Sequence, residues 1–522
     1  MRKTLLSLGL VALLGSGCAS AAMTTDPNRS QPPPEHHQPT PRPFEQPTPP
    51  PFEPPTPPPF EQPPATPYDG VTYQDPGINP FIDPDVDRES TFGLDVDTAS
   101  YTIAQRYIDD GNLPDPASVR VEEYVNFFDQ EYAPPQDDTF AIHVDGGPTP
   151  FLAPDETLLR IGVKAREVGE RSRPSAALTF VIDVSGSMAR EDRLELVKQS
   201  LGFLVEGLRP DDSVAIIVYG TEARVALGPT SGRDGGTILA AIGSLQPEGS
   251  TNAEAGLRLG YQVAREQFRD EAINRVVLAS DGVANVGATS PEEILGRVRD
   301  DAESGIQLVA VGVGMGNFND ALLEQLADQG DGFYAYVNDL SEARRLFVDD
   351  LTGTLESVAL DARVQVEFDP DAVDAYRLVG FENRAIPDED FRDDDVDAGA
   401  IGAGHEVTAL YALRLNFEGD RQSRLGTVVL RWTEPASTRT NEIARDVGAS
   451  DLAASFDATA ATFRLDAIVA ATAERFRGSP LGRTYDLASI AEIANAMSPE
   501  LPRTDQVHAF LDLLDRAARI ER

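Results

Sequence analysis

The middle of the chain alternates between two hydrophobic patterns. Residues 176–183 form a nearly continuous apolar run that ends in a carboxylate, which is typical of a strand buried on both faces of a parallel sheet. Residues 194–208 follow with an apolar side chain every three or four positions, as in an amphipathic helix. The same patterns predict strands at residues 213–219, 275–279, 306–313 and 333–337, and helices at residues 238–245, 253–268, 291–302, 321–327 and 342–355. We therefore expect an α/β domain over residues 173–355, with a doubly wound, mostly parallel sheet and helices on both of its faces.

The pattern changes on both sides of this domain. The N-terminal flanking segment, residues 77–172, mixes helical periodicity and loops over 79–147 with the apolar–polar alternation of strands over 139–168. We expect these strands to pair with residues 364–368, 406–417 and 426–432 in a small β-sandwich. Residues 452–520 have helical spacing, so the C-terminal domain, residues 356–522, should contain strands followed by helices.

The first 76 residues carry targeting and spacer signals instead of a core. Residues 1–17 begin with a basic pair and continue with an apolar run that is shorter than the roughly 20 residues needed to span a bilayer. Residues 27–67 contain 19 prolines, which exclude helix and sheet, so residues 18–76 should form an extended polyproline tether. His36 and His37 lie in this tract and are expected to be solvated.

Cys18 directly follows the apolar run and is the single cysteine of the chain. The arrangement resembles a bacterial lipoprotein signal, in which the peptidase cuts before a cysteine that becomes lipidated. Gly15 stands where such signals usually carry leucine, and an ordinary secretory signal with an incidental cysteine is the alternative. Ala19 follows the cysteine, so no aspartate is present there to retain the protein at an inner membrane. We expect a lipid-anchored protein of the cell envelope, on the periplasmic or surface face of the outer membrane if the cell has two membranes.

Composition excludes several classes of function. The chain has 44 Lys and Arg against 86 Asp and Glu, a net charge of −42, whereas nucleic-acid binding requires a cationic surface. A single cysteine excludes an intramolecular disulfide and a multi-cysteine zinc site.

Polar residues gather where the predicted strands end. Residues 183–188, 249–252 and 280–282 each end a strand or begin a helix, and the carboxyl ends of parallel strands share one edge of the sheet. Together they offer two carboxylates and several hydroxyls, which are hard oxygen donors that suit Mg²⁺ or Ca²⁺. The alternative is structural: the serines could cap the following helix and the aspartates could accept loop N–H groups. Met188 is expected in the core.

Asp183-x-Ser185-x-Ser187, Thr251 and Asp281 resemble the metal-ion-dependent adhesion site of von Willebrand factor type A domains. The resemblance covers about residues 175–355 and implies a Rossmann-like type A domain. It also implies that the two serines and the threonine bind Mg²⁺, with Ca²⁺ or Mn²⁺ as alternatives, directly or through water. The two aspartates would act mainly through water and hydrogen bonds, and an open coordination position would accept a carboxylate.

The wider arrangement resembles a bacterial lipoprotein family. Residues 94–101, 120–128 and 381–405 are similar to segments of that family, in which a type A domain lies between a characteristic N-terminal segment and a C-terminal domain of unknown function. The family implies no settled activity.

A membrane-anchored, metal-dependent protein-binding module is the function we expect, with the cation recruiting an acidic side chain of a partner protein. A structural or assembly factor of the envelope is the first alternative, and a metal-assisted hydrolase is the second. We do not expect an enzyme, because Ser185 lacks a G-x-S-x-G turn and has no histidine near it in the sequence to act as a base.

Two further features invite a metal or catalytic interpretation. Residues 393–397 are rich in aspartate, but a calcium-binding EF-hand loop would need Gly where Ala398 stands and Glu where Gly404 stands. We therefore expect a solvated acidic loop. His143 and His405 lie in or beside predicted strands and are expected to be structural.

Overall fold

The computed structural model describes residues 73, 75–94, 97–169, 172–282, 291–314, 320–349, 353, 355–394, 396, 398–416, 423–435 and 439–522. They belong to one compact unit that runs from Pro64 to Arg522. The signal segment, Cys18 and the proline-rich tract lie outside the described residues. None of the helices described is long and apolar enough to cross a membrane.

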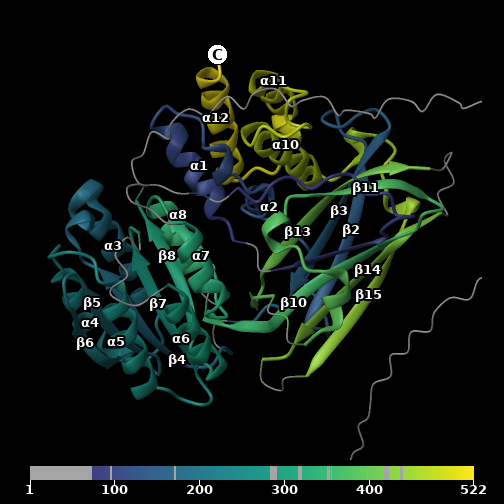
Figure 1. Ribbon diagram of the computed structural model, residues 1–522. Coiled ribbons are helices and arrows are strands. Elements are labelled where there is room, and N and C mark those ends of the chain that lie inside the picture. Colours follow the sequence, from purple (N-terminus) through teal and green to yellow (C-terminus); the bar gives the residue numbers. More distant parts are fainter. Residues whose placement is uncertain are drawn as a thin grey trace, which may run out of the picture. The chain divides into compact units, whose positions relative to one another are not determined.

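The central α/β domain is built on a six-stranded sheet (Figure 1). Its strand order is β6-β5-β4-β7-β8-β9, spanning in that order Ala223–Ser231, Ser213–Tyr219, Ala176–Asp183, Ile273–Ser280, Gln307–Val313 and Tyr334–Val337. All neighbours are parallel except β6, which pairs antiparallel with β5 at the edge of the sheet. The predicted fold class is thus confirmed. The hydrophobic pattern missed β6 because none of its side chains is buried.

Helices cover both faces of this sheet, as the prediction requires. The core on one face includes side chains of α3 (Arg193–Glu206), α4 (Gly235–Gly243) and α8 (Leu340–Arg344). The core on the other face includes side chains of α5 (Ala253–Glu266), α6 (Pro291–Glu303) and α7 (Asp320–Asp328). Adjacent strand residues alternate between the two cores, with Phe180 and Ile182 in the first and Val181 in the second, which explains the continuous apolar run in the sequence.

The last helix of the domain is not the regular α-helix that was predicted. The prediction was a helix over residues 342–355, whereas α8 ends at Arg344 and passes into a π-helical turn, Arg345–Asp349 (η4). A wider turn of this kind shifts the side-chain periodicity, which a 3.6-residue pattern does not register.

Two antiparallel sheets form the predicted β-sandwich, but their composition corrects the predicted pairing. One sheet has the order β1-β10-β14-β15, with β12 beside β10, and comprises Glu89–Gly93, Ser357–Phe368, Arg424–Thr433, Thr440–Gly448 and Ala400–Gly402. The other has the order β11-β13-β3-β2 and comprises Val373–Val379, Glu406–Leu415, Glu156–Ala165 and Phe140–Gly147. Thus β2 and β3 share a sheet with β13, while β10 and β14 lie in the opposite sheet, and both sheets contribute to one core. The alternation of apolar and polar residues shows which face of a strand is buried, but it does not show which strand lies next to it in the sheet.

The chain before the α/β domain contributes to three cores. β1 is a strand within a stretch predicted as helix and loop, and Phe92 on it belongs to the sandwich core. Helix α1 (Ala99–Asp109) places Ile103 and Tyr107 in a core of the α/β domain. The same helix places Tyr101 and Ile108 in the core that α2 (Val121–Val125) forms with the C-terminal helices α10 (Ala461–Phe476), α11 (Leu487–Met497) and α12 (Asp505–Ile520).

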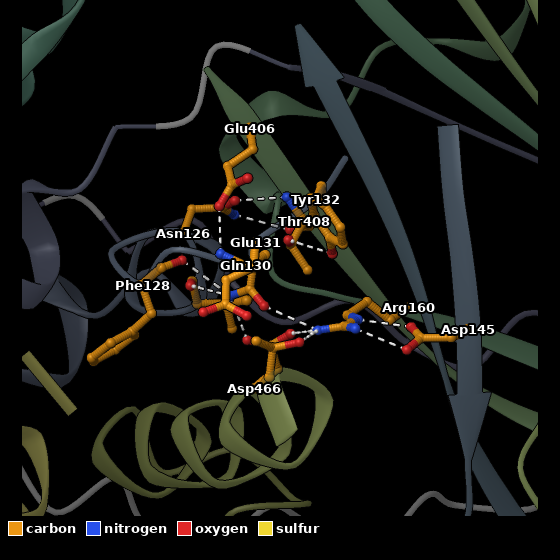
Figure 2. A network of polar contacts seen from close by, with 12 residues as sticks. Asn126, Phe128, Gln130, Glu131, Tyr132, Asp145, Arg160, Glu406, Thr408 and Asp466 are labelled. Carbon is orange, nitrogen blue, oxygen red and sulfur yellow. Dashed lines mark hydrogen bonds and ion pairs between the residues drawn. The ribbon is translucent and has the colours of Figure 1, made fainter. Parts of the chain in front are cut away.

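A buried polar network ties the sandwich to the C-terminal helices (Figure 2). Arg160 on β3 forms a two-bond ion pair with Asp145 on β2, both bonds being 2.8 Å. Its Nη1 also donates to Asp466 Oδ2 on α10 at 2.8 Å and to Gln130 Oε1 at 3.0 Å. Gln130 Nε2 donates to the other oxygen of Asp466 at 2.8 Å, so both carboxylate oxygens are satisfied.

The same network continues to the edge of β13. Asn126 forms two bonds with the backbone of Thr408, donating to its carbonyl at 2.9 Å and accepting its N–H at 2.7 Å. Tyr132 and the Thr408 hydroxyl share a hydrogen bond of 3.0 Å (Figure 2). The chain after α2 is thereby held against the sandwich, although residues 126–132 carry no strand pattern.

Candidate metal site

The candidate site lies where the direction of the chain changes in the sheet. From β4 the chain first builds β5 and β6 on one side, and later adds β7, β8 and β9 on the other. Asp183 is the last residue of β4, and Asp281 directly follows β7. Because β4 and β7 are adjacent and parallel, their carboxyl ends lie side by side, and such a switch point is where open α/β sheets bind ligands.

Two loops complete the site at this edge. After Asp183 the chain runs into a short 3₁₀ stretch, Gly186–Asp192 (η2), and then into α3. The Gly186 N–H donates to the Gly249 carbonyl at 3.1 Å, which holds the loop before α5 against the first loop. Gly249 has φ of +73°, and a Cβ there would lie 2.4 Å from the hydroxyl of Thr221, so this close approach requires glycine.

Four of the five predicted side chains form one hydrogen-bonded cluster. Asp183 Oδ1 accepts the N–H of Ser185 at 2.7 Å. The hydroxyls of Ser185 and Ser187 are 2.9 Å apart, and Ser187 donates to Asp281 Oδ1 at 3.0 Å. Asp183, Ser185 and Asp281 are buried, whereas Ser187 is partly exposed, so the cluster opens to solvent on the side of Ser187.

Thr251 is the fifth predicted residue and lies on the loop beside this cluster. Its side chain is partly exposed, and among the described residues it makes no hydrogen bond to the other four. Asn252 follows it as the N-cap of α5, with its side chain accepting the Ala255 N–H at 3.1 Å. The Thr251 hydroxyl is therefore available beside the cluster, and the capping role belongs to the next residue.

The structural alternative for the serines does not account for their contacts. Ser185 occupies the N-cap position of η2, but its side chain makes no capping hydrogen bond. Its hydroxyl instead bonds to Ser187, and Ser187 bonds to Asp281. Asp183 does accept a loop N–H, as the structural alternative expects, but this hydrogen bond is compatible with an additional interaction with a cation.

Burial controls the electrostatics of Asp183. Burial and, to a smaller extent, the charge of Asp281 raise the pKa of this carboxyl, the hydrogen bonds from Ser185 and Ser280 lower it, and the net result is a pKa of about 6. Near neutral pH and without a cation, the site thus holds a carboxylate that burial makes costly to ionise.

Two residues outside the five predicted ligands contribute to the site, although Ser280 belongs to the polar segment 280–282 that the sequence singled out. Ser280, the last residue of β7, donates to Asp183 Oδ2 at 3.1 Å. Arg193, the first residue of α3, donates from Nη1 to Asp281 Oδ2 at 2.7 Å, and both side chains are buried. Ser280 could have been found from its place beside Asp281 at a strand end. No local signal marks Arg193, which lies 88 residues before Asp281 in the sequence.

The residues present fit a hard divalent cation. The site offers oxygens only, from two carboxylates and three hydroxyls, as Mg²⁺ and Ca²⁺ prefer. Ser187 donates its proton to Asp281 and accepts that of Ser185, so one lone pair of Ser187 and both lone pairs of Ser185 remain for a cation. The described residues contain no group of three or more His, Cys, Asp and Glu that could hold a metal ion.

The other residues singled out in the sequence have structural roles. Met188 is fully buried in the core beside α3. His143 on β2 stacks on Tyr132 and bonds to the Ala133 carbonyl at 2.9 Å. The carbonyl of His405 accepts the N–H of Ala165, next to the pairing of β13 with β3.

The acidic loop around Asp393 is organised by an arginine. The buried guanidinium of Arg363 donates to the carbonyls of Phe391, Asp393 and Val396, the first and last at 2.8 Å. A protein cation thus takes three of the loop carbonyls to which a calcium ion could bind. Arg431 pairs with Asp394, yet the Asp394 side chain is 67% exposed and Asp393 is exposed as well, so the described acidic side chains of the loop are solvated, as expected.

Comparisons with known proteins agree with this architecture. The sequence profile of the von Willebrand factor type A domain matches residues 177–349, a further von Willebrand factor profile matches residues 68–160, and the C-terminal profile of the uncharacterized protein YfbK matches residues 353–520. YfbK of Escherichia coli strain K12 is 38% identical over 453 residues, which are 82% of this chain and 78% of YfbK. The uncharacterized protein sll0103 of Synechocystis is 28% identical over 289 residues, 54% of this chain and 67% of that protein.

Among solved structures, a von Willebrand factor type A protein from Catenulispora acidiphila is similar with 16% identity and a TM-score of 0.39, covering 71% of this chain and 84% of that one. The relationship to YfbK extends over both flanks as well as the central domain. This chain belongs to the bacterial von Willebrand factor type A domain family that includes YfbK.

Proposed function

We propose that this protein is a metal-dependent binding module, in which a divalent cation at the candidate metal site recruits an acidic side chain of a partner protein. The observation that carries the proposal is the hydrogen-bonded cluster of Asp183, Ser185, Ser187 and Asp281 at the switch point of the sheet, with Thr251 beside it. Type A domains typically serve protein interaction, which agrees with the proposal.

Each residue has a defined part in this proposal. Ser185, Ser187 and Thr251 would hold the cation, and Asp183 and Asp281 would hold its waters and orient the serines. We favour Mg²⁺, with Ca²⁺ or Mn²⁺ as alternatives, because the donors are all oxygens. When bound, the cation supplies a positive centre with an exchangeable position for a carboxylate oxygen.

Melting temperature measured against Mg²⁺ concentration tests the proposal. A cation that binds the native state stabilises it by mass action, by about 2.7 kcal/mol at a hundredfold excess over Kd. The wild type should melt several degrees higher with Mg²⁺ than with chelator, whereas Asp183→Ala and Thr251→Ala should show no metal-dependent shift. Thr230→Ala on β6 is the matched control, since the Thr230 hydroxyl bonds to the Gly228 carbonyl and belongs to none of the hydrogen bonds described for the site. Equal shifts in all four proteins would mean that the metal binds elsewhere.

A hydrolase is the weaker candidate. The sequence has no histidine between residues 173 and 355, so Ser185 has no imidazole base within its own domain. We therefore propose recognition rather than turnover. Metal-dependent hydrolysis of ester or phosphate substrates that is lost in Asp183→Ala would reverse this choice.

We also propose that Cys18 is lipidated and anchors the protein in the cell envelope. Support comes from the position of this single cysteine after an apolar run that is too short to span a bilayer. The mature protein should sediment with membranes and incorporate labelled palmitate, and Cys18→Ala should lose both properties. If Cys18→Ala still produced a labelled, membrane-bound mature protein, the lipoprotein assignment would be wrong.

A further inference from the structure

The two oxygens of Asp281 have different partners. Oδ1 accepts the hydroxyl proton of Ser187 at 3.0 Å, and Ser187 is one of the residues that would hold the proposed cation. Oδ2 accepts from Arg193 Nη1 at 2.7 Å on the side of α3. The side chains of Arg193 and Asp281 are only 4% and 5% exposed, so water screens this ion pair weakly.

The backbone makes room for this guanidinium. Gly314 directly follows β8, the strand beside β7, and has φ of +72°. A Cβ at this position would lie 2.2 Å from Nε of Arg193, closer than two such atoms can approach. The Arg193 side chain therefore occupies a space that only a glycine at position 314 leaves open. This steric requirement indicates that the arginine is a specific part of the site and not an incidental contact.

The charges of the site are unbalanced in each metal state. Among the side chains described at the site, two carboxylates and one guanidinium sum to one negative charge, and a divalent cation changes this sum to one positive charge. An uncompensated charge in a mostly buried site is unfavourable. A carboxylate of a bound ligand would bring the net charge of the metal-loaded site to zero. Without Arg193, the charges of the cation and the two aspartates would already sum to zero in the absence of a ligand.

We infer that Arg193 is an internal counter-cation that shifts the balance of the site from metal toward ligand: it weakens the binding of the metal alone and strengthens the binding of an acidic ligand to the metal-loaded site. The inference rests on the proposed function, because it concerns the same site. Coupling between two ligands is reciprocal, so an acidic ligand should raise the affinity for the metal by the factor by which the metal raises the affinity for the ligand.

Binding of Mn²⁺ to the mature chain, followed by the electron paramagnetic resonance signal of free Mn²⁺, tests the inference. Acetate is the probe carboxylate, with chloride at equal ionic strength as reference and with Mn²⁺–acetate complexation measured separately. In the wild type, acetate should increase the apparent Mn²⁺ affinity. Arg193→Gln keeps an N–H donor for Asp281 and removes the charge, so in chloride it should bind Mn²⁺ about tenfold or more tightly, given the strength of charge interactions at low dielectric. The effect of acetate should shrink in this variant.

Two variants separate charge from position. Arg190→Gln removes an equal charge from an exposed residue of η2 and should leave Mn²⁺ affinity within about twofold of wild type. Gly314→Ala crowds the guanidinium away from Asp281 at constant net charge and should shift Mn²⁺ affinity in the same direction as Arg193→Gln. Should Arg193→Gln fail to fold, as judged by circular dichroism, Gly314→Ala decides the question.

The outcomes distinguish the two proposals. If the wild type binds no Mn²⁺, the proposed metal-dependent function fails. A second outcome is that the wild type binds Mn²⁺, while Arg193→Gln binds Mn²⁺ no more tightly than the wild type and responds equally to acetate. Gly314→Ala replaces Arg193→Gln in this comparison if the latter does not fold. The proposed metal site is then retained. Arg193 is then only a structural partner of Asp281, and the inference is overturned.

Discussion

The metal site and the polar network around Arg160 both bury carboxylates beside a guanidinium, yet they differ in what remains open. In the network both oxygens of Asp466 accept hydrogen bonds, from Arg160 and Gln130, and the side chain has no exposed surface. In the metal site the serine hydroxyls bond to each other and to Asp281, and Ser187 is partly exposed. The network is closed at its centre around Asp466, with Asp145 partly exposed at its rim, and the metal site has an open side at Ser187.

The difference indicates which buried polar cluster serves structure and which serves binding. The network joins β2, β3, the segment after α2 and α10, so each of its bonds fixes one segment against another. The metal site takes its donors from loops at a single edge of one sheet, where they add little to the packing of the domain. Cooperative polar networks rigidify a fold when every member is satisfied, whereas unused donor capacity at an opening can be used by a ligand.

The largest expected effect is on the closed network. Arg160→Met leaves Asp466 buried without its charge partner and should reduce the free energy of unfolding by about 3–5 kcal/mol, measured by urea denaturation. Arg439→Met is the control, because Arg439 pairs with Glu434 at the surface, and it should cost less than about 1 kcal/mol. Similar losses in both variants would show that the network is no more structural than a surface ion pair.

The next effect concerns the protonation of the metal-free site. Burial raises the pKa of Asp183 to about 6 in the folded protein, above about 3.9 for an unfolded chain. The folded state therefore holds this proton more tightly, and the associated stability is present below pH 4 and is lost as the pH rises through 6. In chelator, the wild type should lose up to about 3 kcal/mol across this range relative to Asp183→Asn. Parallel pH profiles of the two proteins would contradict the raised pKa.

A third effect distinguishes the two clusters by their response to metal. At a hundredfold excess over Kd, Mg²⁺ should stabilise both the wild type and Arg160→Met by about 2.7 kcal/mol, because the network is not part of the site. Ser187→Ala should lose most of this stabilisation while retaining wild-type stability in chelator to within about 1 kcal/mol, the value of one hydrogen bond. If Arg160→Met abolished the response to Mg²⁺, the two clusters would be coupled and the comparison would fail.

The smallest effects give the sharpest contrast. Ser280→Ala removes the hydrogen bond to Asp183, and Tyr132→Phe removes the one to Thr408, so each should cost about 1 kcal/mol in chelator. Ser280→Ala alone should also weaken the Mg²⁺-dependent rise in melting temperature. Equal Mg²⁺ responses would show that Ser280 does not help to orient Asp183 toward the cation.

Local pattern was sufficient for the centre of the chain. The run over 176–183 and the helical spacing over 194–208 predicted β4 and α3 nearly to their ends, because a strand buried on both faces and an amphipathic helix each leave a direct record in the sequence. The end of such a strand is also visible, so the place of Asp183 and Asp281 at one edge of the sheet followed from the alternation of strands and helices.

The hydrophobic pattern did not predict which strands pair with one another. The alternation in β2 and β3 predicted strands, but only the folded chain placed them beside β13, opposite β10 and β14. β1 and β6 were missed because one lies among helical signals and the other has no buried side chain. Periodicity records how much of each side chain is buried and contains no information on which distant segment buries it.

The sequence by itself determined that this protein has a type A domain, that five oxygen-bearing side chains lie at the carboxyl edge of its sheet, and that no histidine or cysteine accompanies them. The tertiary structure decided how those side chains are used. In the folded chain Arg193 pairs with Asp281 in the space left by Gly314, and Ser280 donates a hydrogen bond to Asp183. The network around Arg160 buries Asp466, whereas Ser187 in the metal site stays partly exposed. The reason is physical: charge pairing acts through space between residues far apart in the chain, and folding alone brings them within range.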